Sequence, residues 1–561
     1  MEWTNRPRKT GDARSAGPRA GRTAHADAPG QPRSVVVRGA AGAAATGRRA
    51  GGEGRAGVAA LACFAEPARS SRTMTPPAPA RPSARRRALL HGARRALGLA
   101  GAVGLGRTAS ALPAALALPR GVWLQLRAAG IEPANCSLVV RDLQLGTPLV
   151  NWLPQQPRSP ASVLKLVTLY AALNLLGPDY RWRTPVYAIG PIESGVLAGD
   201  LGFVGSGDPH LMAHDLLRLA LRLRGLGLRR IAGNVLVDRS AYALPPHDPG
   251  LFDGHPLAPY NVGPDAFLLD FGSLQLQFQA RGDQVRVWSE PALRGFAAQP
   301  PRLAAGPCAD WRQRLRPDFS MPLAPRFAGS YSAACGEQHW DIAALMPADA
   351  FVQAVLGAVL RQAGIDWNGQ VVAGRLPRQA TLLSTWESQP LAVLMRDIDK
   401  YSNNVMAQQV FLTLALHAGH RPADFPAAAA VVRQWLQQQS LAMPGLVLDN
   451  GCGLSRRARL SAGGLDRLLR AAWRSPLMPE FVQTLPLSGE DGTLRHRFRA
   501  PGLRGMLHAK TGTLDGVLAL AGYLQGEDGR RRSLVALIDD PRAEQGWPAL
   551  QALLEYASGR G

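Results

Sequence analysis

The stretch that decides the fold runs from Pro160 to Leu176 and reads PASVLKLVTLYAALNLL. Its residues are apolar nearly all round a helical wheel, so the helix that they predict should be buried. Gly177 and Pro178 end this helix. Its one charged residue is Lys165. A lysine in such a helix must find partners or lose its proton, because desolvation disfavours the charged form.

Ser162 and Lys165 stand three residues apart at the start of this helix, which places both side chains on one face. Backbone N–H groups at a helix N-terminus suit a nucleophile and the oxyanion that it generates. A neutral amine beside a serine hydroxyl is a general base for nucleophilic attack. The alternative is a surface helix on which Lys165 extends its ammonium into water.

A second candidate lysine is Lys510, in the segment Lys510-Thr511-Gly512-Thr513 at the end of a predicted strand. Of the 64 Lys and Arg residues only Lys9, Lys165, Lys400 and Lys510 are lysine. Codon bias toward arginine is an alternative explanation for this scarcity of lysine. A glycine in a strand lets a ligand approach the backbone, and the lysine offers a fixed cation for a carboxylate. The alternative is an ordinary strand-to-turn transition.

A third candidate segment is Ser402-Asn403-Asn404, two residues after Lys400. It lies within a predicted long helix over Pro390–Leu416 and offers a second hydroxyl for proton relay and an amide for a peptide carbonyl. Alone this pattern is common. Combined in this order with Ser-x-x-Lys and Lys-Thr-Gly, it is specific.

The three segments together resemble the D-alanyl-D-alanine carboxypeptidase/endopeptidase family, the low-molecular-weight class C penicillin-binding proteins, which are serine peptidases related to β-lactamases. The resemblance covers about residues 120–558. The 240-residue separation of Ser162 and Ser402 fits this family, whose insertion lies between the first two motifs. Further matching segments are Leu176–Arg181, Gly205–Pro209, Asp449–Arg456 and Asp491–Leu494.

The resemblance implies a role for each motif residue. Ser162 attacks the carbonyl of the penultimate D-Ala and Lys165 takes its proton, whereas Ser402 relays a proton to the leaving amine. Asn404 holds the acyl chain's amide. The terminal carboxylate is received by Lys510, Thr511 and Thr513 around Gly512, and backbone N–H groups of Ser162 and Thr513 form the oxyanion hole. Asn403 and Cys452 depart from the family pattern, at positions with no expected catalytic role.

The fold that we expect is α/β (α+β): a β-lactamase/transpeptidase-like domain with an antiparallel sheet flanked by helices, carrying a mainly β inserted module. The sheet should combine a hairpin over Ser137–Asp142 and Pro148–Leu153 with strands over Met506–Lys510, Val517–Leu524 and Ser533–Ile538. The expected domain limits are a disordered leader over 1–118, a first transpeptidase part over 119–183, the inserted module, in two subdomains, over 184–346, and a second transpeptidase part over 347–561.

The net charge of +23 is mostly a property of the leader. Residues 1–120 contain 21 Lys and Arg against 5 Asp and Glu, and the remaining residues contain 43 against 36. A nucleic-acid partner is therefore not expected, since binding needs a basic surface on a folded domain. Arginines followed by a short apolar stretch and small residues predict a signal peptide over about 85–117. We expect a periplasmic or otherwise extracytoplasmic protein without a transmembrane span in the mature chain.

Four cysteines follow the leader, and an exported chain permits disulfides. We favour a pair between Cys308 and Cys335, which flank one loop-rich stretch. No Cys or His spacing resembles a ligand set, so neither a metal nor a cofactor is expected.

The expected function is a serine-type D-Ala-D-Ala carboxypeptidase/endopeptidase that acts on peptidoglycan peptides and binds β-lactam antibiotics as covalent inhibitors. The alternatives are a β-lactamase, which the long insertion disfavours, and a non-catalytic cell-wall binding protein on the same scaffold, which the complete set of motif side chains disfavours. A nucleic-acid binder is third.

Overall fold

The computed structural model describes residues 118–560. The signal peptide and nearly all of the leader that the sequence predicts lie outside these residues. Within residues 118–560, no helix combines the length and the apolar character that crossing a bilayer requires.

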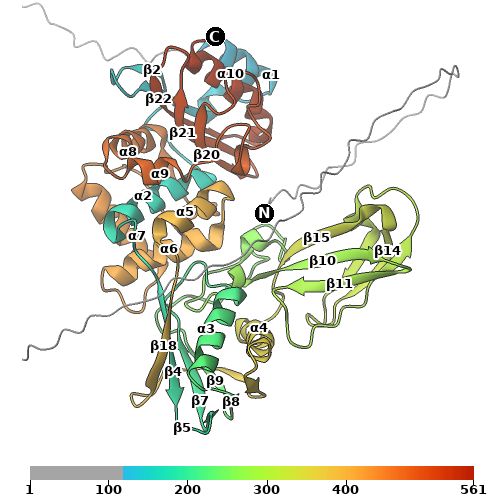
Figure 1. Ribbon diagram of the computed structural model, residues 1–561. Coiled ribbons are helices and arrows are strands. Elements are labelled where there is room, and N and C mark those ends of the chain that lie inside the picture. The colour runs from blue at the N-terminus through green and yellow to red at the C-terminus, as the bar shows by residue number, and fades with distance from the viewer. Residues whose placement is uncertain (1–117, 561) are drawn as a thin grey trace, which may run out of the picture. The chain divides into compact units, whose positions relative to one another are not determined.

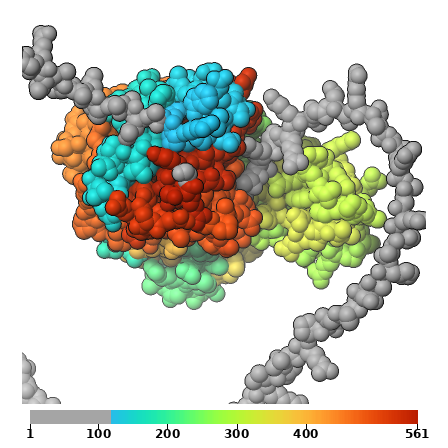
Figure 2. Space-filling view, turned by 90° about the horizontal axis from the view of Figure 1, so that it is seen from above, coloured from blue at the N-terminus to red at the C-terminus, as the bar shows by residue number. Residues whose placement is uncertain are grey.

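A five-stranded antiparallel sheet brings together the two ends of the described chain (Figure 1). Its strand order is β2-β1-β22-β21-β20, with Val139 of β1 opposite Val535 of β22. The N-terminal hairpin therefore joins the C-terminal strands, as predicted, and Figure 2 shows blue and red residues side by side on one surface. The strands are β1 (Cys136–Asp142), β2 (Pro148–Trp152), β20 (Leu507–Leu514), β21 (Val517–Gln525) and β22 (Arg531–Asp539).

The sheet separates two hydrophobic cores, because successive side chains of a strand point to opposite faces. On β1, Leu138 and Val140 pack in the core with α1 (Arg120–Ala128) and α10 (Trp547–Ser558). Val139, between them, packs in the core that the sheet shares with the central helices. The result is three layers, with helices on both faces of the sheet.

The central helices surround α2 (Lys165–Leu176), which a 3-10 turn over Ala161–Leu164 precedes. Residues Lys165–Leu173 are all buried, so the prediction of a buried helix is confirmed. The neighbouring elements are α5 (Leu391–Lys400), α6 (Asn404–His417), α7 (Phe425–Gln438), α8 (Ala462–Arg474), α9 (Met478–Val482) and the short paired strands β3 (Pro157–Arg158) and β19 (Leu460–Ser461).

The single long helix predicted over Pro390–Leu416 is wrong, because the structure divides it into α5 and α6. Ser402 has a φ of 59°, a left-handed conformation that cannot continue a helix. Asn403 is the N-cap of α6, where its side chain accepts a hydrogen bond of 3.1 Å from the Met406 N–H. The apolar residues on both sides suggest one helix, but the largely polar run over 399–404 and the favoured N-cap residue Asn403 are sequence signals for this break.

The first part of the inserted module is a mixed sheet with the order β17-β9-β7-β4-β18. Helices α3 (Ala213–Gly225) and α4 (Ala348–Gln362) pack with this sheet in one core, which includes Val186, Phe203 and Val355. The strands are β4 (Arg183–Ile189), β7 (Asp200–Val204), β9 (Val235–Asp238), β17 (Val371–Ala373) and β18 (Thr381–Glu387), and a smaller sheet holds β5 (Ile192–Glu193), β6 (Val196–Leu197), β8 (Arg230–Ile231) and β16 (Asp366–Trp367).

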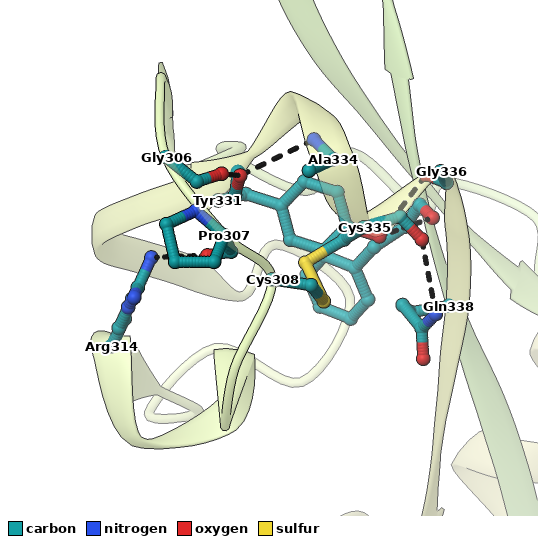
Figure 3. Close-up of a disulfide and its surroundings, with 11 residues drawn as sticks. Gly306, Pro307, Cys308, Arg314, Tyr331, Ala334, Cys335, Gly336 and Gln338 are labelled. Atoms are coloured by element: carbon teal, nitrogen blue, oxygen red, sulfur yellow. Dashed lines mark hydrogen bonds between the residues drawn. A yellow bond between two sulfur atoms is a disulfide. The ribbon is translucent and has the colours of Figure 1, made fainter. Parts of the chain in front are cut away.

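The second part of the module contains two three-stranded sheets and a disulfide between Cys308 and Cys335, as predicted. Figure 3 shows the disulfide among short loops, where Gln338 donates a hydrogen bond of 3.0 Å to the Cys335 carbonyl oxygen. The strands are β10 (Ser273–Arg281), β11 (Gln284–Glu290) and β15 (Glu337–Ala343) in one sheet, and β12 (Arg302–Ala304), β13 (Leu315–Asp318) and β14 (Arg326–Ser332) in the other.

The pairing of strands bears on where the inserted module ends. Strand β18 pairs with β4 and β17 pairs with β9, although both follow residue 346 in the chain. Helix α4 contributes Phe351 and Val355 to the same core. We propose that the module continues to about residue 387, with its helix α4 counted inside it.

The disulfide should stabilise the second part of the module by restricting its unfolded chain. Cys308 and Cys335 are 27 residues apart, and a loop of this length corresponds to about 3.5 kcal/mol in the chain-entropy account. We expect the double variant Cys308→Ser/Cys335→Ser to unfold at lower temperature and to be cleaved faster by protease within residues 270–345. Reductant should have the same effect on the wild type and none on the double variant. An equal effect of reductant on both proteins would contradict this prediction.

Candidate active site

The 3-10 turn that precedes α2 presents Ser162 to the site. The Nζ atom of Lys165 lies 3.1 Å from the Ser162 Oγ, so the two side chains that the sequence places on one helical face are in contact. Ala161, next to the serine, is fully buried and has a φ of 44°. A left-handed alanine is strained and requires support from the surrounding structure. The turn therefore holds Ser162 in a defined position between β20 and α2.

Lys165 is fully buried and is surrounded by neutral acceptors. Besides the serine, its Nζ contacts the Asn404 Oδ1 at 2.7 Å and the Cys452 carbonyl oxygen at 2.8 Å. Burial lowers the pKa of Lys165, and electrostatic interactions with Cys452 and Asp399 offset this effect only in part. The surface-lysine alternative is wrong, because no part of this side chain reaches water.

Ser402 lies at the break between α5 and α6, where its Oγ accepts a hydrogen bond of 2.9 Å from the Lys510 Nζ. Two residues later, Asn404 begins α6, and its amide N–H donates to the Tyr260 carbonyl oxygen at 3.0 Å. The break is what allows these two side chains to point to the same place. Asn403, between them, points away and caps α6.

Lys510, Thr511, Gly512 and Thr513 lie on β20, the edge strand of the central sheet. Lys510 is fully buried. Burial lowers its pKa, the nearby charge of Lys165 lowers it further, and Asp399 raises it. The hydroxyl of Thr511 donates to that of Thr493 at 2.8 Å, whereas Thr513 is exposed. The strand thus supplies one buried amine and two hydroxyls at the edge of the site.

Gly512 allows β20 to lie directly against the nucleophile turn. A Cβ atom at this position would stand 2.9 Å from both the Pro160 carbonyl oxygen and the Ser162 nitrogen. Any larger residue would push the strand away from Ser162. The glycine of the Lys-Thr-Gly segment is therefore a close-approach residue in this structure.

All the predicted site side chains from the Ser-x-x-Lys and Ser-x-Asn segments contact one another or a lysine of the site. Three groups that were not predicted from the sequence join them. These are the carbonyl oxygen of Cys452, the hydroxyl of Thr493 and the buried carboxylate of Asp399. Cys452 and Thr493 belong to segments that were already noted for their resemblance to the family. The Cys452 contact could still not be predicted, because it uses a backbone carbonyl oxygen, which every residue type has. Asp399 carried no motif signal.

Lys400, whose role the sequence left open, binds the segment that carries Thr493. Its Nζ contacts the Asp491 Oδ2 at 2.5 Å and the Leu485 carbonyl oxygen at 2.8 Å. Thr493 lies two residues beyond Asp491 and accepts the Thr511 hydroxyl. Lys400 therefore supports one side of the site without pointing into it.

Comparison with known proteins identifies the relatives of this chain. The sequence profile of the D-Ala-D-Ala carboxypeptidase 3 (S13) family matches residues 125–555. The D-alanyl-D-alanine carboxypeptidase DacB of Haemophilus influenzae is 26% identical over 421 residues, which cover 73% of this chain and 86% of the relative. The D-alanyl-D-alanine carboxypeptidase of Actinomadura sp. is 28% identical over 421 residues, 71% of this chain and 77% of the relative.

Solved structures agree on the fold. The crystal structure of penicillin binding protein 4 (dacB) from Haemophilus influenzae superimposes with a TM-score of 0.63 at 23% identity, covering 78% of this chain and 98% of that one. The same protein complexed with a β-lactam superimposes with a TM-score of 0.60. The predicted β-lactamase/transpeptidase-like fold is confirmed at this level.

Gly453 offers a test of how tightly the nucleophile turn is held. A Cβ atom on Gly453 would stand 1.9 Å from the Ala161 carbonyl oxygen, and the residue has a φ of 85°. We expect Gly453→Ala to reduce the free energy of unfolding by about 2–4 kcal/mol, through strain and steric overlap. Gly529 has a φ of 72° with no atom within 4 Å of its Cβ position, so Gly529→Ala should lose only about 1 kcal/mol. Urea unfolding measures both losses, and equal values would contradict this account.

Proposed function

The chain belongs to the D-Ala-D-Ala carboxypeptidase 3 (S13) family, and from this premise we propose that it cleaves D-Ala-D-Ala peptides through an acyl-enzyme on Ser162. The protein is a serine-type D-Ala-D-Ala carboxypeptidase, a peptidase with relatives that share this activity. The observation that carries the proposal is the contact between the buried Lys165 amine and the Ser162 hydroxyl.

The surroundings of Lys165 suit a neutral amine. A neutral amine has two N–H groups and one lone pair, and its two other contacts are acceptors, the Asn404 Oδ1 and the Cys452 carbonyl oxygen. When both N–H groups bind these acceptors, the lone pair faces the Ser162 hydroxyl, which then donates its hydrogen bond to nitrogen. Burial favours the same neutral form. Lys165 would thus accept the serine proton as the general base.

Acylation then proceeds by attack of the Ser162 Oγ on the carbonyl carbon of the penultimate D-Ala. The new C–O bond forms as the C–N bond to the terminal D-Ala breaks. In the proposed arrangement the backbone N–H groups of Ser162 and Thr513 donate to the oxyanion. Gly512 supports this role, because it lets β20 approach the Ser162 nitrogen.

The leaving amine needs a proton, and Ser402 is placed to deliver one. Its Oγ accepts from the Lys510 Nζ, so its own hydroxyl hydrogen is free to be donated to the amine nitrogen. The proton that Lys165 took from Ser162 replaces the one that Ser402 gives up, so Lys165 is neutral again. Water then attacks the acyl carbon, and Lys165 takes a proton from it and returns it to the Ser162 Oγ as the acyl C–O bond breaks, which releases the shortened peptide.

Substrate binding would use the remaining side chains around these groups. The Asn404 amide donates one hydrogen to the Tyr260 carbonyl oxygen, and its second N–H can bind a carbonyl oxygen of the acyl chain. Lys510, Thr511 and Thr513 would bind the terminal carboxylate. We further propose endopeptidase cleavage of peptidoglycan cross-links, covalent inhibition by β-lactams and a site of action outside the cytoplasmic membrane.

A β-lactamase with the same acylation residues is the second candidate function, because it would differ only in rapid deacylation. A non-catalytic binding protein is the third, and it would keep the contacts but release no product. A long-lived penicillin adduct with D-Ala release separates the proposed peptidase from both.

Ser162→Ala should abolish D-Ala release from a pentapeptide and labelling by a fluorescent penicillin, because no other group in the proposal forms the acyl bond. The wild type should carry a stable adduct on the peptide that contains Ser162, detectable by gel and mass spectrometry. Ser240→Ala, at a serine that lies far from α2 in the chain, serves as the control and should behave as the wild type. Labelling that survives in Ser162→Ala would mean that the nucleophile is a different residue, and rapid turnover of penicillin would favour the β-lactamase.

Lys165→Arg should reduce kcat/KM for D-Ala release at least 10²-fold, because arginine stays protonated and cannot be the base. Lys400→Arg is the matched control: its side chain binds Asp491, and arginine can keep this ion pair. Steady-state kinetics of both variants across pH 6–9 provides the measurement. Normal turnover by Lys165→Arg would refute the assignment of the base.

A further inference from the structure

Asp399 is a carboxylate buried beneath the candidate active site. It lies near the end of α5, three residues before Ser402, and its side chain is fully buried. Its Oδ2 accepts a hydrogen bond of 2.9 Å from the Thr484 hydroxyl. Within the part of the chain that the structure describes, its buried Oδ1 has no hydrogen-bond partner. One hydroxyl does not compensate a buried negative charge, so a positive charge must balance it.

The two buried lysines of the site lack a negatively charged partner within the described chain. Lys165 and Lys510 are both inaccessible to solvent. Their contacts among residues 118–560 are to hydroxyl, amide and carbonyl oxygens, and neither forms an ion pair with a carboxylate. Two ammonium groups so close together in a dry site would repel each other and would each lack a counter-charge.

Among the described residues, Asp399 is the carboxylate whose charge raises the pKa of both lysines. Of the cations that attract Asp399, Lys510 has the strongest effect, followed by Lys165 and Lys400. Lys400 already has a partner in Asp491. Burial raises the pKa of Asp399, whereas the charges of these lysines lower it, so a protonated lysine nearby favours the ionised carboxylate.

We propose that Asp399 is the counter-charge that determines which of the two buried active-site lysines is protonated. One carboxylate can balance one ammonium. Because Lys510 binds Ser402, which follows Asp399 by three residues, Lys510 carries the positive charge, and Lys165 stays neutral beside Ser162. Asp399 contacts neither lysine directly and acts through them, so it is a positioning residue. This inference rests on the proposed function, in which Lys165 is the base and Lys510 receives a carboxylate.

The charge on Asp399 should affect how kcat/KM depends on pH. Activity requires a neutral Lys165 and a protonated Lys510, so kcat/KM should rise as the first loses its proton and fall as the second does. Removal of a nearby negative charge makes both ammonium groups less stable. Both flanks of the profile should then move toward lower pH. The other titratable groups around the cluster are Lys400 and Asp491, which pair with each other, and the Cys452 thiol beside Lys165.

The test is the variant Asp399→Asn, which removes the charge and keeps the shape. D-Ala release from a pentapeptide is measured across pH 5–10. We expect both flanks of kcat/KM to move down by about one pH unit, so that activity falls about tenfold at alkaline pH and recovers on acidification. Asp397→Asn, a part-exposed aspartate on the same helix, should leave the profile in place. A uniform loss of activity in Asp399→Asn with unmoved flanks would indicate a merely structural role and overturn the inference.

A double-mutant cycle in thermal stability tests the pairing of Asp399 with Lys510 without an activity assay. The losses in melting temperature caused by Asp399→Asn are compared in the wild type and in a Lys510→Met background. The loss should be larger in the wild type, because only there does the substitution leave a buried ammonium uncompensated. If Asp399→Asn alone does not fold, the double variant should restore folding. Equal losses in the two backgrounds, or no restoration, would overturn the inference. A wild type that releases no D-Ala would refute the proposed function and leave this cycle as the test of the pairing.

Discussion

The burial of the Lys165 amine is the constraint on which the rest of the site depends. An amine without access to water needs acceptors from the protein, and these come from parts of the chain 239 and 287 residues away, the Asn404 side chain and the Cys452 carbonyl. The helices that supply them must pack closely around α2. The packing of the core therefore also places the acceptors of the site, and the same burial that makes a charged lysine costly favours the neutral amine that the proposed mechanism requires.

The central sheet packs against the turn that holds Ser162 and completes the site. Its edge strand β20 brings Lys510 and Gly512 against the turn that holds Ser162, and the pairing of β1 with β22 holds the two ends of the described chain in one sheet. The inserted module takes part through a single backbone atom among the contacts described above, the Tyr260 carbonyl oxygen that binds Asn404. A long insertion is thus compatible with a compact set of reacting groups.

Several parts of the fold and of the candidate site could be predicted because they depend on local sequence patterns. The three motif segments, the buried helix and the Cys308–Cys335 pair follow from residue types and spacing. The joining of the N-terminal hairpin with the C-terminal strands follows instead from the fold that the family resemblance implies. The break between α5 and α6 was not predicted, because the apolar residues on both sides suggest one helix and Ser402 has no special propensity for a left-handed backbone, although Asn403 is a favoured N-cap residue. The pairing of β18 with β4 was equally hidden, because it joins strands nearly 200 residues apart.

The sequence by itself determined which side chains the proposed chemistry uses: a serine, four polar side chains of the second and third motifs, and two of only four lysines in the chain. Their spacing also determined that Ser162 and Lys165 share one helical face. Only the tertiary structure decided the charge state of these groups. Protonation depends on how deeply an amine is buried and on which carboxylate lies near it. The charge of Asp399, which contacts neither lysine, acts on both because α5, α2 and β20 converge. No local pattern encodes that convergence.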